Sequence, residues 1–107
     1  MIATSFAILR QGTGYIAGEG DGIVTAKGAP ASRFIYLFDA NTLELVRSIT
    51  SLNTGRYMFI ALDVDREYLV MVRDYKKDLE PFAWDYVKPA NSLTVKEQLA
   101  LWKSWQN

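Results

Sequence analysis

Residues 22–74 alternate short apolar runs with turn residues, and this pattern constrains the fold more than any other feature of the chain. The apolar runs follow one another at intervals of roughly 10 residues, a spacing typical of strands in an all-β sandwich. Strands are expected at 34–39, 43–46, 57–62 and 68–72, with turns at 39–42, 53–55 and 63–65. In the second of these turns, Gly55 is expected to take a positive φ. The sequence therefore predicts a β-sandwich domain over residues 21–90.

The expected strand 34–39 is apolar on both of its faces. Side chains alternate across a strand, so Ile35 and Leu37 point one way while the aromatic Phe34, Tyr36 and Phe38 point the other way. Such a strand is either central and covered on both faces, or it presents aromatic side chains to a partner. The sequence leaves both alternatives open.

The N-terminal region is rich in glycine, since residues 11–22 hold five of the seven glycines. Ordering glycine costs more backbone entropy than ordering other residues, which favours a loop or extended arm over a packed strand. We expect residues 1–20 to form an N-terminal arm that includes a strand-like patch at 6–9. The arm either orders against a partner or is a plain flexible terminus.

The C-terminal region predicts one more strand and then a helix. Prolines bound residues 81–89, which suits an edge strand because proline cannot donate to a ladder. Alternation predicts that Phe82, Trp84 and Tyr86 share one face of this strand. Within the expected helical segment 91–107, Thr94 and Glu97 fit a capping box. Its apolar face is expected to comprise Val95, Leu99, Trp102 and Gln106, widened by Leu101 and Trp105. These tryptophans pack either on their own sandwich or in a neighbouring subunit.

Composition argues against several classes of function. Twelve basic residues balance twelve acidic ones, whereas nucleic-acid binders usually carry a basic excess. The chain has no cysteine and no histidine, and so lacks thiol chemistry and the commonest metal ligand and general base. We therefore expect no enzymatic activity, no cofactor, no bound metal and no nucleic-acid partner. The acidic alternation at Asp63, Asp65 and Glu67 is better explained as a solvated turn than as a calcium site.

The start of the chain, residues 1–10, carries a short apolar patch without a basic beginning or a long hydrophobic region. Such a segment fits neither a secretory signal nor a membrane span. The sequence thus predicts synthesis in the cytoplasm, without secretion by a signal peptide and without a membrane partner.

Residues 22–74, about half of the chain, resemble the transthyretin-like (Cna-B-type, carboxypeptidase-regulatory-like) β-sandwich family. The residues that carry the resemblance are Gly22, Val24, Gly28, Pro30, Ala31, Leu37, Asp39, Ser51, Gly55, Tyr57, Phe59, Leu62, Tyr68 and Val70. The later residues Asp85, Val87 and Pro89 resemble the ending that such domains carry in small structural proteins of tailed bacteriophages. The resemblance implies a transthyretin-like Greek-key sandwich and a binding or assembly role.

The resulting hypothesis is a structural assembly protein of a tailed-phage virion, in the tail, baseplate, connector or capsid decoration, made in the host cytoplasm. Its expected partners are copies of itself, in a homo-oligomer, and other virion proteins. The expected interface residues are Phe34, Tyr36, Phe38, Phe82, Trp84, Tyr86, Leu99, Trp102 and Trp105. The alternative is a carbohydrate- or surface-binding accessory module in which Tyr75, Phe82, Trp84 and Tyr86 stack on sugar rings.

Overall fold

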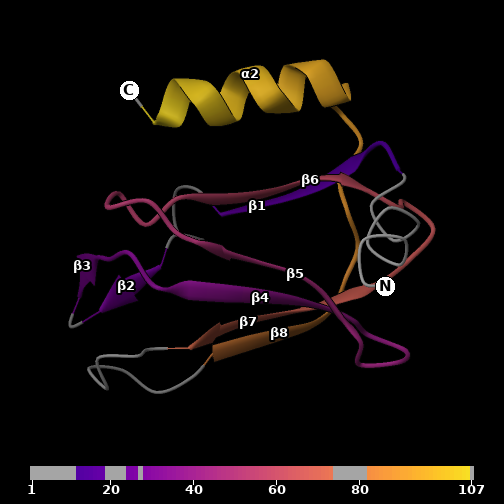
Figure 1. Cartoon of the computed structure of the whole chain (residues 1–107), viewed down its shortest axis with the longest axis horizontal. Helices are drawn as coiled ribbons and strands as arrows, with labels where there is room; N and C mark the ends of the chain where they lie inside the picture. The colour runs from indigo at the N-terminus through magenta and orange to yellow at the C-terminus, as the bar shows by residue number, and fades with distance from the viewer. Residues whose placement is uncertain (1–11, 19–23, 27, 74–81, 107) are drawn as a thin grey trace, which may run out of the picture.

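The computed structural model describes residues 12–18, 24–26, 28–73 and 82–106, which form antiparallel strands and one C-terminal helix (Figure 1). The predicted all-β class is confirmed. The elements are β1 (Gly14–Gly18), β2 (Thr25–Ala26), β3 (Ala29–Pro30), β4 (Phe34–Asp39), β5 (Leu45–Thr50), β6 (Tyr57–Leu62), β7 (Tyr68–Arg73), β8 (Phe82–Val87) and α2 (Val95–Trp105).

The elements stack in three layers (Figure 1). A four-stranded sheet with the order β5-β4-β7-β8 faces a two-stranded sheet made of β1 and β6. Helix α2 packs on β6, on the side of the two-stranded sheet that faces away from the four-stranded one. The short strands β2 and β3 form a separate hairpin.

The core lies between the two sheets, where apolar side chains from both are almost fully buried. Its members include Ile16, Val24, Ile35, Leu37, Val46, Tyr57, Phe59, Leu62, Tyr68, Val70 and Val72. Burying one large apolar side chain contributes about 1.5–3 kcal/mol relative to leaving it exposed. The faces predicted for the strands at 34–39 and 68–72 are confirmed, since Ile35 and Leu37 in β4 and Tyr68 and Val70 in β7 have no exposed surface.

The turn between β4 and β5 depends on the buried carboxylate of Asp39. Its Oδ1 accepts hydrogen bonds from the N–H of Asn41 (2.8 Å) and of Thr42 (3.2 Å), as the predicted Asx chemistry requires. Leu43 then adopts a left-handed conformation (φ 62°) and donates its N–H to the Asp39 carbonyl. Because this extends the turn, β5 covers Leu45–Thr50 instead of the predicted 43–46.

The glycine-rich stretch corrects one expectation. Residues 14–18 form β1, which pairs with β6 and places Ile16 in the core, so the prediction of loop or arm is wrong here. Close packing explains the glycine at position 14, because a Cβ there would lie 2.6 Å from the Cβ of Pro89 and 2.8 Å from Cγ1 of Val64. The strand-like patch at 6–9 lies outside the described residues.

Helix α2 confirms the capping prediction but presents a different face to the body. Thr94 Oγ1 accepts from the Glu97 N–H (3.1 Å), and Glu97 Oε1 accepts from the Thr94 N–H (2.9 Å). The buried residue of the helix is Gln98, whereas Leu99, expected on the apolar face, is 40% exposed. Of the helices in the described part of the chain, none has the length and apolar character to cross a membrane.

Candidate interaction surfaces

The outer face of the four-stranded sheet carries an aromatic row along β4. The Phe34 and Tyr36 ring centroids lie 6.5 Å apart, as do those of Tyr36 and Phe38. Cross-strand neighbours extend the row on the same face, and we call this set the outer aromatic face: Phe34, Tyr36, Phe38, Leu45, Leu69 and Met71. Phe34 is 42% exposed, and Tyr36 and Phe38 are half-buried.

No helix or strand among the described residues packs on the outer aromatic face, because α2 lies on the opposite side of the molecule (Figure 1). Strand β4 is therefore central in its sheet and yet covered on its inner face only, within the part of the chain that the structure describes. The two alternatives for the strand, coverage on both faces and presentation of aromatic side chains to a partner, both stay predictions. An apolar face of this kind is suited to binding another protein.

Strand β8 forms one edge of the four-stranded sheet, as the flanking prolines predict, but a bulge interrupts it. Trp84 pairs with Val70 while Val87 pairs with Tyr68, so Asp85 and Tyr86 together stand opposite a single residue of β7. Tyr86 adopts a positive φ of 54°, and the Asp85 carboxylate accepts its N–H (2.8 Å). The extra residue breaks the two-residue alternation.

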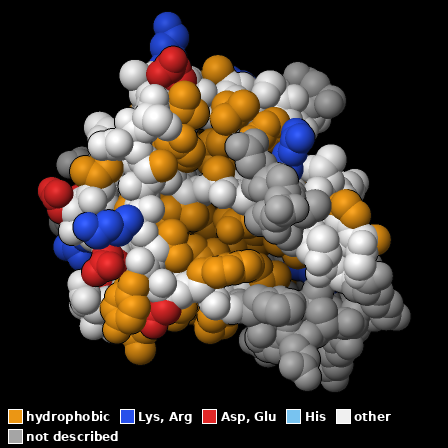
Figure 2. Space-filling model, turned by 180° about the vertical axis from the view of Figure 1, so that it is seen from behind, with side chains coloured by type: hydrophobic (Ala, Val, Ile, Leu, Met, Phe, Trp, Pro, Cys, Tyr) orange, Lys and Arg blue, Asp and Glu red, His pale blue; other side chains and the backbone are white. Residues whose placement is uncertain are grey.

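The faces predicted for β8 change accordingly, because Phe82, Trp84 and Tyr86 do not all share one face. Val87, and not Tyr86, continues the inward-facing line and packs against the core. Trp84 and Tyr86 are 43% and 60% exposed, and the side chain of Phe82 lies outside the described part. Figure 2 shows apolar side chains gathered in a hollow on the rear side of the molecule.

The tryptophans of α2 pack on their own protein, although part of each ring stays accessible. Trp102 and Trp105 are half-buried, with ring centroids 6.3 Å apart in an edge-to-face arrangement. The guanidinium carbon of Arg56 lies 5.3 Å from the centroid of the Trp105 ring, within cation–π range. The helix is thereby joined to the segment that precedes β6.

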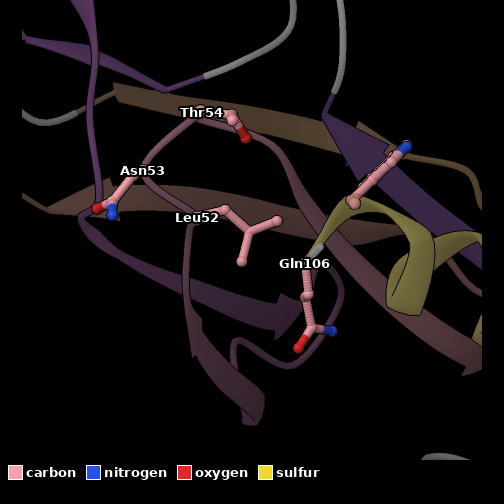
Figure 3. A pocket seen from close by; sticks show the side chains of 5 residues that line it. Leu52, Asn53, Thr54 and Gln106 are labelled. Carbon is pink, nitrogen blue, oxygen red and sulfur yellow. The ribbon is translucent and has the colours of Figure 1, made fainter.

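A hollow of about 360 Å³ lies between the β5–β6 turn and the end of α2 (Figure 3). It is lined by Leu52, Asn53, Thr54, Trp105 and Gln106. In the turn, Gly55 has a φ of 82°, as predicted, and its N–H bonds the Leu52 carbonyl (2.8 Å). The lining offers amide, hydroxyl and indole groups and no charged group, so it can contribute hydrogen bonds and stacking.

Gln98 is the buried residue of α2, and the sequence analysis did not identify its role in holding the helix to the sheet. Its Oε1 accepts from the Ala61 N–H (3.1 Å), and its Nε2 donates to the carbonyls of Thr13 (2.8 Å) and Leu93 (3.0 Å). Ala61 lies where the β1–β6 register shifts and has a φ of 55°. Gln98 lies on the same helix face as Leu101 and Trp105, and this spacing is the sequence signal from which its burial could have been predicted.

A charged cluster closes the end of the core next to the β4–β5 turn. Arg66 Nη1 bonds Asp39 Oδ2, and Arg66 Nε lies 3.4 Å from Asp63 Oδ2. Burial would raise the pKa of Asp39, but hydrogen bonds from the Asn41 N–H, from Arg66 and from the Thr42 N–H outweigh it, so the pKa lies below its ordinary value of 3.8. Asp39 is therefore ionised at neutral pH.

The acidic residues after β6 form a hydrogen-bonded turn. Asp63 Oδ1 accepts the Asp65 N–H (2.9 Å), and the Asp63 N–H donates to the Tyr68 hydroxyl (3.2 Å). Among the described residues, no group of three or more potential ligands is placed to hold a metal ion.

Comparison with known proteins adds no identification. No protein-family model matches the chain, and no curated protein or solved structure is significantly similar to it. The resemblance to the transthyretin-like family stays a prediction.

Proposed function

We propose that this chain is a structural assembly protein that acts through protein–protein contacts, and that it belongs to the virion of a tailed bacteriophage. The proposed fold is a transthyretin-like Greek-key sandwich, supported by two antiparallel sheets around one core. The placement in a virion rests on the resemblance of the sequence. The assembly role has independent support from the outer aromatic face.

The outer aromatic face is the observation that carries the proposal. Phe34 and Leu45 are 42% and 45% exposed, and α2 lies on the opposite side of the molecule. With strands about 4.8 Å apart and a rise of about 3.3 Å per residue, four strands of six residues present a face of roughly 400 Å². Burying such a face against a partner would remove the aromatic row from water, at about 25 cal/mol per Å² of apolar surface.

Solution mass, measured by light scattering after size exclusion over a range of concentrations, tests the proposal. The wild-type chain should grow in mass with concentration, because copies of the outer aromatic face bind one another. Tyr36→Glu should lower the mass that is reached at high concentration, since it places a charge in the middle of the row. Leu99→Glu introduces the same charge on the exposed side of α2 and should leave the mass unchanged.

A wild-type chain that stays monomeric throughout the range would contradict self-assembly. A loss of mass in Leu99→Glu but not in Tyr36→Glu would move the interface from the sheet to the helix. Circular dichroism of each variant shows whether the fold is retained.

A second candidate function, carbohydrate binding, is favoured by one observation. Trp84 and Tyr86 on the edge strand β8 are 43% and 60% exposed, and accessible aromatic rings can stack on sugars. Titration of the wild-type chain with oligosaccharides, followed by tryptophan fluorescence, tests this function. A saturable change that disappears in Trp84→Ala would favour carbohydrate binding, and an unchanged signal would count against it.

A further inference from the structure

The two edges of the four-stranded sheet differ in how open they are to another strand. On β8, the bulge at Asp85 and Tyr86 disturbs the ladder, a device that protects edges from pairing. Strand β5 also has an irregularity, where Leu37 pairs with Arg47 and Phe38 with Leu45, but its register with β4 is regular from Thr50, opposite Phe34, to Arg47. Between Arg47 and Thr50, β5 contains no proline and no lysine, and its one charged residue, Arg47, stands opposite the inward-facing Leu37 of β4.

The backbone of β5 presents hydrogen-bonding groups at this edge. The Ser51 N–H donates to the Arg33 carbonyl (2.9 Å), which makes Arg33 and Ser51 a hydrogen-bonded pair. Bonded positions alternate along an antiparallel ladder, so Ile49 and Arg47 also bond to β4. The N–H and C=O groups of Ser48 and Thr50 therefore point to the edge that no described strand pairs with, and both residues are exposed.

We propose that β5 pairs antiparallel with β5 of a second copy of this chain, and so joins two four-stranded sheets into one sheet of eight strands. Ser48 of one copy would stand opposite Thr50 of the other, and Thr50 opposite Ser48. Each of these two pairs can form two backbone hydrogen bonds. This inference rests on the proposed assembly function and names its first contact.

The composition of β5 favours a second copy as the occupant. In this register Arg47, the single charged residue of the strand, stands opposite Ser51 of the other copy, so no like charges meet. The two Ser48–Thr50 pairs place hydroxyls side by side on the outer face, where such cross-strand pairs stabilise a sheet by about 0.2–1 kcal/mol each.

Pairing also gives the outer aromatic face a useful size. The whole outer face of one four-stranded sheet covers roughly 400 Å², which is about half of the roughly 800 Å² per partner in a standard interface. Two copies joined at β5 place their outer aromatic faces side by side on a sheet face of roughly 800 Å². The edge-paired dimer, and not the single chain, would therefore be the unit that binds the next partner.

Ser48→Pro tests the pairing in the full-length chain. Proline removes the outward N–H of Ser48 and costs no bond to β4, while Ser48→Ala keeps the N–H and serves as the matched control. Light scattering should show dimers and larger species for wild type and Ser48→Ala. Ser48→Pro should stay monomeric up to concentrations at least tenfold above those at which the wild type forms dimers. Tyr36→Glu should stop at the dimer, because its edge is intact.

Amide hydrogen exchange of the wild-type chain provides a readout that needs no variant. The Ser48 and Thr50 amides should exchange more slowly as the concentration rises. By the same alternation the Ala83 N–H of β8 faces the other free edge, and its exchange should not change.

The outcomes separate this inference from the proposed function. If Ser48→Pro retains its fold and assembles like the wild type, and the Ser48 and Thr50 amides gain no protection, edge pairing is wrong. If Tyr36→Glu alone reduces the mass, the assembly function stands without edge pairing. If Ser48→Pro alone reduces it, edge pairing stands and the outer aromatic face has no part in self-assembly.

Discussion

Strands β6 and β4 are both apolar on their two faces, yet they have different surroundings. In β6, Phe59 is buried in the core and Met58, on the other side, is 4% exposed beneath the helix layer. In β4, Ile35 is buried in the core, whereas Phe34 on the outer side is 42% exposed. The comparison shows that an alternating sequence assigns faces, while coverage of a face depends on a distant segment that docks there.

The side of the molecule that carries β1, β6 and α2 is closed by polar as well as apolar contacts. Gln98 reaches from the helix to β6 and to the residue before β1, and Tyr15 forms backbone hydrogen bonds of 2.9 and 2.8 Å with Ala90. Among the described residues, α2 lies on the opposite side of the molecule from the outer aromatic face (Figure 1). Perturbing the closed side should therefore lower stability, and perturbing the open side should alter association.

Removal of β1 should have the largest effect on the closed side. Deleting residues 1–18 removes Ile16 from the core and the pairing partner of β6, and we expect the cooperative thermal transition to disappear. Deleting residues 1–11 leaves β1 in place, so the difference between the two truncations, measured by calorimetry, reports on the strand itself. An unchanged melting temperature in the longer deletion would show that β1 is dispensable.

Gln98→Ala should have the next largest effect. The substitution removes two part-buried hydrogen bonds, from the Ala61 N–H and to the Thr13 carbonyl, and leaving a buried polar group without a partner costs about 1–3 kcal/mol. We expect the free energy of unfolding in urea to fall by about 2–4 kcal/mol. Gln106→Ala, at the exposed end of the helix, is the matched control. A loss equal to that of the control would mean that Gln98 does not hold the helix to the sheet.

Acid should weaken the charged cluster in which Arg66 joins Asp39, at the end of β4, to Asp63, after β6. The pKa of Asp39 is lowered in the folded state, so its contribution to stability is present above the unfolded pKa and lost as the pH falls through the folded pKa. The stability difference between wild type and Asp39→Asn should therefore shrink as the pH falls from about 5 to about 2. Denaturant unfolding at several pH values measures it, and a constant difference would contradict the assignment.

Much of this arrangement follows from local sequence rules. The inward face of β4, the positive φ of Gly55 and the capping box at Thr94 each depend on neighbouring residues alone, and each was predicted correctly. The expectation for residues 14–18 failed because glycine can serve close packing as well as flexibility. Close packing at Gly14 involves Pro89, which lies far away in the sequence.

The candidate surfaces were predictable to a smaller extent. Alternation correctly placed Phe34, Tyr36 and Phe38 on one face of β4. It failed for Tyr86, because a bulge inserts a residue without a strong local signal. Helical spacing places Gln98 on the face of Leu101 and Trp105, but it does not identify the partners of that side chain, which come from two other segments of the chain.

The contact between Arg56 and Trp105 should give the smallest effect, and it tests how firmly the last turn of α2 is held. A cation–π pair at a partly exposed site contributes about 0.5–1 kcal/mol, so Arg56→Gln should lower the free energy of unfolding by about that amount. The emission of Trp105 should change with it, because the guanidinium lies 5.3 Å from the ring centroid. Lys103→Gln removes a charge from the exposed side of the helix and should change neither quantity. If the two variants behave alike, general charge and not the stacked guanidinium holds the end of the helix against the β5–β6 turn.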